Sequence, residues 1–408
     1  MRCAGIVAEY NPFHNGHKYH IQSARRLTGC DKVIAIMSGG FVQRGEPAIF
    51  DKFTRARAAL ECGADMVIEL PTVFALSSAE QFARGAVRIL NSSQIVDYLC
   101  FGSECGELSA LTSFVAASDT NSEELGNSIR AMASDGKSYS RSFYEASLKG
   151  PASAFAADVL KTPNSLLAAE YIRSLKATSS HILPYCIKRK GAQYGETDMC
   201  GEYSSAAAIR SALSNSIGAL NVLNAIPSEI RDRFVSACDS CNFSERERIF
   251  FKLLQYRVLT SDISYLSSIA HVTEGLENVM FRAAKTCAGY DEFLFACKSK
   301  RYTMARIRRI ASCAVLGINS ELMRSAYTDD SALYIRVLGV RKDSLDCLRE
   351  LSNNSSVPII TRYSDIKALS PLASSLINLD ILSSDIQSLV TKRDSKPLCE
   401  YNRPFLCV

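Results

Sequence analysis

The sequence predicts an α/β protein in which an N-terminal parallel sheet is followed by a mainly helical C-terminal region with a small α/β ending. Residues 1 to about 118 alternate short apolar runs with helical patterns, and such alternation is typical of βαβ units with parallel strands. The runs are apolar throughout, as expected when helices cover both faces of a sheet. A chain of 408 residues also exceeds the usual size of a single core, so two or three domains are expected.

The expected strands and helices follow one another along this N-terminal part. The strands cover residues 5–8, 33–37, 66–70 and 96–101, and the helices cover residues 18–27, 52–62, 79–90 and 107–117. Ligands of such sheets bind beyond the carboxyl ends of the strands. The polar segments at those ends, residues 9–17, 38–47 and 102–106, are therefore the candidate site.

The loop after the first strand carries His14-Asn15-Gly16-His17 and leads into the first helix. A helix N-terminus offers unpaired amides and the positive end of a dipole, which favour phosphate, and a glycine lets the backbone approach a ligand closely. No nucleophile and base pair accompanies the loop, so it does not indicate hydrolysis. Histidines that face a triphosphate suit nucleotidyl transfer. The competing interpretation is a polar turn whose histidines only cap a helix.

The same histidines raise the question of a metal site. His14, His17 and His20 have a His-x-x-His-x-x-His spacing, but metal binding needs helical geometry and Asn15-Gly16 is expected to interrupt the helix. Phosphate is therefore favoured over metal. Cys238 and Cys241 form a CxxC pair without a second pair at zinc-finger spacing. We predict no structural metal.

Two further polar loops belong to the candidate site. Residues 38–47 form a segment too long and too glycine-rich for a plain connector, and it offers Gln43 and Arg44 as possible substrate or phosphate contacts. It is interpreted as a lid or binding loop, with a flexible surface loop as the alternative. Gly102 lies at the end of the fourth strand. Its lack of a side chain is interpreted either as allowing an adenine or ribose to pass close to the backbone or as an ordinary feature of the turn that ends the strand.

Residues 120–180 are expected to form a helical insertion. Asn164 lies near the start of its helix over residues 166–175, where simple capping is the alternative role. A strand over residues 182–188 precedes Arg189, and Ser204, Ser205 and Arg210 open the next helix as a second possible phosphate site.

The chain from about residue 221 to 318 is expected to be helical and includes a strongly basic segment. Its cations, with Tyr302 among them, are expected on a helix as either a solvated face or contacts to a nucleic-acid backbone. They are Lys298, Lys300, Arg301, Arg306, Arg308 and Arg309. A small βαβ-like ending is expected over residues 334–340, 344–351 and 358–361.

Composition limits the class of protein. Apolar residues make up 47% and charged residues 22%, which is typical of globular proteins. No membrane segment or signal peptide is indicated, so a cytoplasmic location is expected. The 15 cysteines then act as small buried hydrophobes, and the net charge of +5 is compatible with RNA binding. We predict an ATP-binding domain over residues 1–220 and a tRNA-binding, mainly helical region over residues 221–408.

Seven segments together resemble the bacterial tRNA(Met) cytidine acetate ligase family among the HIGH-motif nucleotidyltransferases. They are AEYNPFHNGHKYH, MSGGFVQRGEPA, DMVIELP, FGSE, TPNSLLAAEY, IKRKGAQY and KSKRYT. The resemblance implies that ATP, with Mg²⁺, activates acetate as acetyl-adenylate and releases pyrophosphate. The acetyl group then passes to the wobble cytidine of elongator tRNA(Met) as N4-acetylcytidine, and AMP is released.

The resemblance also implies catalytic roles for His14 and His17, whereas the RNA-binding role of the basic segment is expected from its charge alone. The residues implied to bind ATP are Val7, Ala8, Glu9, Tyr10, Asn11, Pro12, Phe13, His14, Asn15, Gly16, His17, Lys18, Tyr19, His20, Gly102, Asn164 and Arg189. The chain departs from related nucleotidyltransferases at residues 204–210, SSAAAIR, where a Ser-Ser-Thr-x-Ile-Arg motif is common. Two alternatives stay open: an adenylyltransferase for a small metabolite, and a non-catalytic nucleotide-sensing RNA-binding protein.

Overall fold

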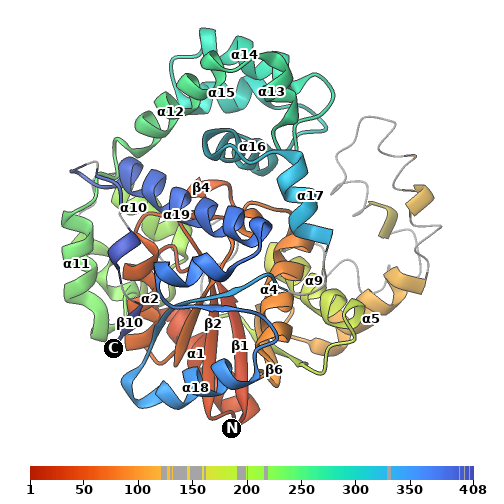
Figure 1. The fold of residues 1–408 in the computed structure, drawn as a ribbon, viewed down its shortest axis with the longest axis vertical. Helices are drawn as coiled ribbons and strands as arrows, with labels where there is room; N and C mark the ends of the chain where they lie inside the picture. Colours follow the sequence, from red (N-terminus) through yellow and green to blue (C-terminus); the bar gives the residue numbers. More distant parts are fainter. Residues whose placement is uncertain are drawn as a thin grey trace.

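A central sheet flanked by helices on both faces forms the body of the protein (Figure 1). The computed structural model describes residues 1–120, 126–128, 131, 145–147, 159, 162–190, 199, 201–215, 219–328, 332–394, 396–398, 400–403 and 405–408. The strands are β1 (Cys3–Ala8), β2 (Lys32–Ser38), β3 (Phe41–Val42), β4 (Glu46–Pro47), β5 (Met66–Leu70), β6 (Tyr98–Ser103), β7 (Leu183–Lys188), β8 (Ile335–Val340), β9 (Ile359–Ile360) and β10 (Leu406–Cys407).

The helices alternate with these strands in the N-terminal part and then follow one another. The first group is α1 (Asn15–Thr28), α2 (Lys52–Glu61), α3 (Thr72–Ala75), α4 (Ala79–Ser93), α5 (Leu108–Thr120), α9 (Pro163–Ala177) and α10 (Ala206–Ser214). The second group is α11 (Arg231–Asp239), α12 (Arg246–Thr260), α13 (Ile263–Ser268), α14 (Leu276–Thr286), α15 (Tyr290–Cys297), α16 (Met304–Leu316), α17 (Ser320–Thr328), α18 (Leu345–Asn354) and α19 (Pro371–Thr391).

The sheet has the order β10-β8-β5-β2-β1-β6-β7, and β9 pairs with β8. Strands β5, β2, β1, β6 and β7 run parallel, whereas β8 is antiparallel to β5. Alternate residues of β2 enter two different apolar clusters, with Ile34 and Ile36 on one face and Val33 and Ala35 on the other. The predicted covering of both sheet faces is therefore confirmed, although β5 is not wholly apolar because it carries the buried Glu69.

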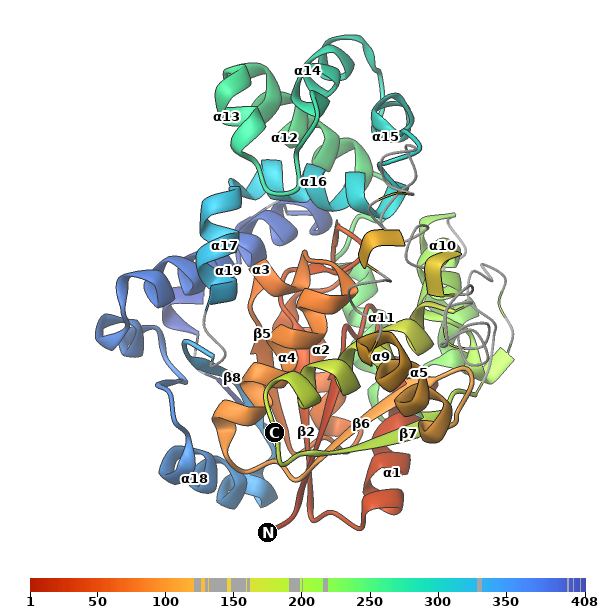
Figure 2. The same ribbon diagram turned by 90° about the vertical axis from the view of Figure 1, so that its right-hand side faces the viewer.

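The two faces are covered by different helices. Helices α4, α5 and α9 cover one face, and α1, α2, α10 and α11 contribute to the cluster on the other (Figures 1 and 2). The N-terminus lies at the bottom of Figure 1, so the parallel strands rise toward α16 and α19. The helical segment from α12 to α17 thus lies beyond their carboxyl ends, on the side where ligands of such sheets bind.

Several sequence-based boundaries differ from the structure. The fourth strand is Tyr98–Ser103, two residues later than expected. The first helix begins at Asn15 and includes Gly16, so the expected interruption is wrong. These residues occupy the first helical positions, whose amides have no intrahelical partner, so the weak helix propensity of Asn and Gly matters little there.

The expected small βαβ-like ending is confirmed as β8, α18 and β9, in which β8 and β9 pair in parallel, and its strand β8 also joins the central sheet. Residues 66–68 of β5 pair with β8, and Leu406 of β10 pairs with Gly339 of β8. The boundary at residues 220–221 remains a prediction, although the sheet takes strands from both sides of it. Most of the expected insertion, residues 121–161, lies outside the described residues apart from short pieces.

A buried ion network fastens the C-terminal segment to the sheet. The Lys52 amine lies 2.8 Å from Glu69 Oε1 and 2.9 Å from Glu400 Oε1, and Arg336 Nη1 lies 3.2 Å from Glu69 Oε2. The side chains of Lys52, Glu69 and Glu400 are fully buried. Removing one partner of such a network leaves a buried charge unpaired, which lowers the free energy of unfolding by about 3–5 kcal/mol. The network therefore holds the region around residue 400 against β5 and α2.

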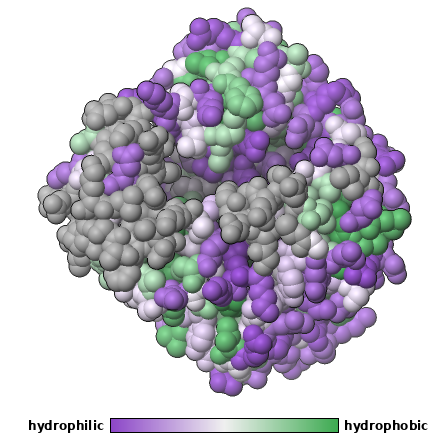
Figure 3. Space-filling model, turned by 180° about the vertical axis from the view of Figure 1, so that it is seen from behind, coloured by the Kyte–Doolittle hydropathy of each residue, from purple (hydrophilic) through white to green (hydrophobic). Residues whose placement is uncertain are grey.

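Hydrophilic side chains cover most of the coloured surface in the rear view, with smaller hydrophobic patches between them (Figure 3). Within the described ranges, no helix is both long and apolar enough to cross a membrane. Cysteines there are free thiols and most are buried, including Cys238 and Cys241, as expected for small hydrophobes. The described part of the chain also holds no group of three or more His, Cys, Asp and Glu side chains that could bind a metal ion.

Candidate active site

The loop between β1 and α1 places two imidazoles at the N-terminus of α1. His14 is the N-cap residue, and its Nδ1 accepts a hydrogen bond from the Gly16 amide at 3.0 Å. His17 Nδ1 accepts from the His14 amide at 3.2 Å. The two rings lie 3.8 Å apart between centroids. Because each Nδ1 accepts, each neutral ring carries its proton on Nε2.

The histidines of this loop stay neutral over the physiological pH range. Burial, followed by the positive charges of Arg189 and Arg210, lowers the pKa of His14 to about 3. Burial and neighbouring His14 lower the pKa of His17 well below its usual value. Burial and Arg189 lower that of His20 to about 4. The interpretation of this motif as a helix cap is correct in geometry, yet capping uses Nδ1 and leaves Nε2–H as a donor.

Gly16 is required by the cap itself. A Cβ atom at this position would lie 2.8 Å from His14 Cε1 and 3.0 Å from His14 Nδ1. Any larger residue therefore displaces the imidazole from the Gly16 amide. Within the loop, Tyr10 adopts φ +50° and is fully buried, with its ring centroid 4.9 Å from that of His17. The ring contact and burial hold this backbone conformation, which non-glycine residues rarely adopt.

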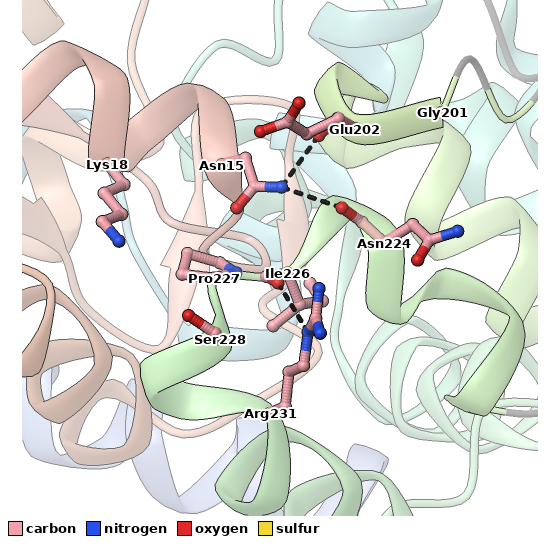
Figure 4. Close-up of a pocket in the computed structure, with 9 residues that line it drawn as sticks. All are labelled: Asn15, Lys18, Gly201, Glu202, Asn224, Ile226, Pro227, Ser228 and Arg231. Carbon is pink, nitrogen blue, oxygen red and sulfur yellow. Dashed lines mark hydrogen bonds between the residues drawn. The ribbon is translucent and has the colours of Figure 1, made fainter.

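The side chain of Asn15 forms hydrogen bonds that hold a distant segment against α1. Its Nδ2 donates to the carbonyl oxygens of Glu202 at 3.0 Å and Asn224 at 2.9 Å. Figure 4 shows these bonds at the edge of a pocket of about 470 Å³, into which Lys18 and Arg231 also project. Lys18 forms an ion pair with Glu229. The side chains of Asn15 and Lys18 thus attach the segment around residues 201–231 to α1.

The end of β6 meets the start of α9 at a carboxylate. Glu104 accepts hydrogen bonds from Asn164 Nδ2 at 2.5 Å and from the Ser165 amide at 3.1 Å. Although burial opposes it, hydrogen bonds from Asn164 and Thr162 and the charge of Arg189 hold the pKa of Glu104 below its usual value. Arg189 Nε lies 3.8 Å from Glu104 Oε1, and the Arg189 side chain packs beside Gly102. The structure therefore brings Gly102, Asn164 and Arg189 together, as predicted from the sequence.

Residues 38–47 form a docked hairpin, so the alternative of a flexible surface loop is wrong. The Gln43 amide donates to Glu9 Oε1 at 2.8 Å, and Ser312 Oγ donates to the Gly45 carbonyl at 2.9 Å. Gly45 has φ +80°, and a Cβ there would lie 2.3 Å from the Arg309 amide nitrogen. The turn of the hairpin and strand β4 therefore pack directly on α16. Arg44 is exposed at the turn.

Arg55 is a site residue that the sequence analysis missed. It is 1% exposed, and its Nη1 donates to the carbonyl oxygens of Glu9 at 2.7 Å and Ser38 at 2.9 Å. Its Nη2 donates to the Gly39 carbonyl. One guanidinium group therefore joins the ends of β1 and β2 and positions both loops. The segment TRARAA places an arginine on the apolar face of α2, and that mismatch is the signal that could have identified it.

The segment at residues 204–210 contributes its arginine to the site. Ser205 caps α10 by accepting from the Ala208 amide at 3.0 Å, and Ser204 Oγ donates to the Gly201 carbonyl at 2.9 Å. Arg210 Nη1 donates to the Asn11 carbonyl at 2.7 Å, and its Nη2 lies 3.4 Å from Glu46 Oε1. Arg210 therefore reaches the histidine loop, whereas both serine hydroxyls take part in local bonds.

The basic segment does not lie on a single helix, so the expectation of a basic helix over residues 298–309 is wrong. Helix α16 begins at Met304, so Lys298, Lys300 and Arg301 precede it. Lys298 and Lys300 are exposed, and Arg301 pairs with Glu274 at 2.7 Å. Thr303 caps α16, and two of the later cations contact neighbouring segments of the protein. Arg306 donates to the His271 carbonyl at 3.0 Å, and Arg309 Nη1 lies 3.4 Å from the Gln43 carbonyl.

Comparisons with known proteins agree with this architecture. A family model described as HIGH Nucleotidyl Transferase matches residues 1–400. The chain is 37% identical over 407 residues to the tRNA(Met) cytidine acetate ligase of Thermoanaerobacter sp. (strain X514), with 100% of each chain covered. It is 36% identical to the protein of the same name from Acetivibrio thermocellus, with 96% of each covered.

Solved structures show the same similarity. The apo crystal structure of Thermotoga maritima TmcAL superposes with a TM-score of 0.91 at 30% identity, and each chain is covered completely. A second structure of that protein, bound with alpha-thio ATP, has a TM-score of 0.89 at 29% identity over the same coverage.

Proposed function

This chain belongs to the HIGH nucleotidyl transferase family and, within it, to the tRNA(Met) cytidine acetate ligases, and from that premise we propose its reaction. The chain activates acetate with ATP and acetylates the wobble cytidine of elongator tRNA(Met). One observation carries the proposal: two neutral imidazoles with Nε2–H donors share the N-terminus of α1 with Arg189 and Arg210.

In the first step, an acetate oxygen attacks the α-phosphorus of ATP. A new O–P bond forms, the bond to the bridging oxygen breaks, and pyrophosphate leaves. His14 and His17 donate Nε2–H bonds to the phosphate oxygens on which negative charge develops. A preorganised donor of this kind contributes about 2.7–4 kcal/mol of transition-state stabilisation. The α1 dipole and Arg189 add positive potential at the same place.

In the second step, the cytidine N4 attacks the acyl carbon of acetyl-adenylate. A C–N bond forms, the C–O bond to phosphate breaks, AMP leaves, and N4 gives up one proton. In the proposed reaction, Mg²⁺ would be bound together with ATP. The neighbouring carboxylates Glu104 and Glu46 face Asn164 and Arg210, respectively. We therefore propose that Mg²⁺ is held by phosphate oxygens and water, as is common for this ion.

The proposed partners are ATP, acetate and tRNA, and the proposed location is the cytoplasm. Exposed Lys298 and Lys300, together with Arg301, remain candidates for contacts to the tRNA backbone. The residues that the resemblance assigns to ATP binding are proposed in that role, whereas Arg306 and Arg309 are not proposed as tRNA contacts because they bond to protein carbonyls.

The test is to incubate the protein with ATP, labelled acetate and total bacterial tRNA. The expected products are AMP, pyrophosphate and labelled N4-acetylcytidine in the tRNA. Without tRNA, acetate-dependent exchange of pyrophosphate into ATP isolates the first step. An adenylyltransferase for a small metabolite would give no acetate-dependent exchange, and a nucleotide sensor would give no exchange with any acid.

A further inference from the structure

A second pocket lies next to the histidine loop and is built from five elements far apart in the sequence. The hairpin contributes Glu46 and Pro47, α12 contributes Arg246, Glu247 and Phe250, and α15, α16 and α19 contribute Tyr290, Arg308 and Val390. Its walls are therefore aromatic and apolar, and its polar groups are arginines and carboxylates. The sequence analysis did not single out this combination, because its members are up to 344 positions apart.

Two polar atoms in this pocket lack hydrogen bonds. Glu46 Oε1 and Tyr290 Oη are buried, and neither has a hydrogen-bond partner among the described residues. Glu46 Oε1 lies 3.4 Å from Arg210 Nη2, but that contact lacks hydrogen-bond geometry. A buried polar atom without a partner costs about 1–3 kcal/mol. Such atoms in a pocket indicate a ligand that supplies the missing bonds.

The charge of Glu46 determines which hydrogen-bonding group the ligand must present. Although burial opposes it, the positive charges of Arg210, Arg246 and Arg308 keep the pKa of Glu46 below its usual value. The ionised carboxylate can only accept, so the ligand must present an N–H or O–H donor at Oε1. Acetate offers no such donor at neutral pH, and the negative charge of a phosphate group is repelled by the carboxylate. An exocyclic amine of a nucleobase does, and carboxylates are suited to accept from cytosine N4.

The walls and size of the pocket fit the amino edge of a base. Phe250 and Tyr290 form an edge-to-face pair with centroids 5.3 Å apart, and single-stranded bases pack on aromatic side chains. The free volume is about 30 Å³, whereas one water needs about 10–15 Å³. The pocket thus admits an amine and the adjoining ring edge, and the rest of the base lies at the rim near exposed Glu247.

The pocket is close to the proposed chemistry. Arg210 joins the two places, because its Nη1 donates to the Asn11 carbonyl at 2.7 Å while its Nη2 faces Glu46. The same Arg210 charge contributes to the lowered pKa of His14. A base held at Glu46 therefore lies one guanidinium group away from the histidine loop.

We propose that the Glu46–Tyr290 pocket reads the amino edge of the acceptor cytosine of the tRNA, with Glu46 Oε1 accepting from N4–H and Tyr290 Oη bonding to the same base. The inference rests on the proposed function, since it assigns the second substrate of that reaction. Glu46 and Tyr290 act by selecting and positioning the base before acetyl transfer. A uracil would present a carbonyl oxygen to the Glu46 carboxylate and be rejected.

The test measures binding of an anticodon stem-loop RNA with C or U at the wobble position, by fluorescence anisotropy. The wild-type protein should prefer C by about tenfold or more, the discrimination typical of a specific base contact. Glu46→Gln should reduce this preference to within about threefold, because an amide can donate to uracil O4. Tyr290→Phe should weaken binding of the C-containing RNA by about two- to tenfold without lowering the melting temperature, since it removes an unpaired buried hydroxyl.

Controls separate this inference from the proposed function. Acetate-dependent ATP–pyrophosphate exchange should persist in Tyr290→Phe, and Tyr256→Phe, on an exposed position of α12, should match the wild type in every assay. An unchanged C-to-U preference in Glu46→Gln overturns the proposal, whether or not affinity falls. Unchanged affinity in Tyr290→Phe removes Tyr290 from the site. Absence of exchange in the wild type contradicts the proposed function, while the base preference remains measurable.

Discussion

The dual role of His14 allows its capping and catalytic contributions to be measured separately. His14→Ala removes both the Nδ1 acceptor for the Gly16 amide and the Nε2–H donor. Loss of an N-cap costs about 0.5–2 kcal/mol of stability. Loss of a preorganised donor costs about 2.7–4 kcal/mol of transition-state stabilisation, or about 10²–10³ in rate. His14→Asn restores a cap acceptor but provides no donor in the place of Nε2.

The expected results therefore differ between the two assays. In acetate-dependent ATP–pyrophosphate exchange, both variants should lose about 10²–10³ in rate. In thermal unfolding, His14→Ala should melt a few degrees lower, whereas His14→Asn should stay close to the wild type, because Asn is among the best N-cap residues. His181→Ala, at an exposed histidine that follows α9 and bonds to the Val96 carbonyl, is the control for the exchange assay and should leave the exchange rate unchanged.

Exchange within about threefold of the wild type in His14→Asn would show that the imidazole serves only as a cap. The catalytic assignment of His14 would then be withdrawn. A melting temperature equal to that of the wild type in His14→Ala would instead contradict the capping contribution.

Three further predictions concern ATP, tRNA and pH. Arg189→Ala should raise the apparent Kd for ATP and leave tRNA affinity unchanged, and loss of tRNA binding alone would reassign Arg189 to the RNA surface. Replacing Lys298, Lys300 and Arg301 by Ala should reduce the slope of log affinity for tRNA against log salt concentration by up to about three, while ATP–pyrophosphate exchange is unchanged. Filter binding at two salt concentrations measures this slope, and unchanged affinity at both would show that the tRNA binds elsewhere. The pKa of His14 is about 3 in the folded protein, whereas a histidine in the unfolded chain has a pKa near 6.5. Below about pH 6.5 the His14 imidazole is therefore protonated only in the unfolded chain, so the free energy of unfolding falls as the pH drops toward 3. Urea unfolding at several pH values should show that the free energy of unfolding of His14→Asn falls less steeply with acid than that of the wild type, by up to about 1.4 kcal/mol per pH unit. The same pH dependence in the two proteins would contradict a neutral buried His14.

Local patterns in the sequence were enough to predict the N-terminal elements and most of the candidate site. The strand at Met66–Leu70 has the predicted bounds, and the helices around it begin where Lys52 and Ala79 were expected. These predictions succeed because hydrophobic periodicity and capping residues act within a few positions of the chain. The rule that parallel strands end at the same edge indicated the ends of the strands before Gly102 and Arg189, whereas the place of Asn164 was implied only by the family resemblance.

Only the tertiary structure decided which distant residues meet. Lys52 and Glu69 are charged residues that a sequence pattern assigns to the surface, yet both are fully buried, because Arg336 and Glu400 supply compensating charges. In the same way, β8 completes the sheet beside β5, although about 265 residues separate them in the sequence. Periodicity shows that a side chain is buried but not what it is buried against. Pairing across such distances depends on the shape and charge of surfaces that exist only after the chain has folded.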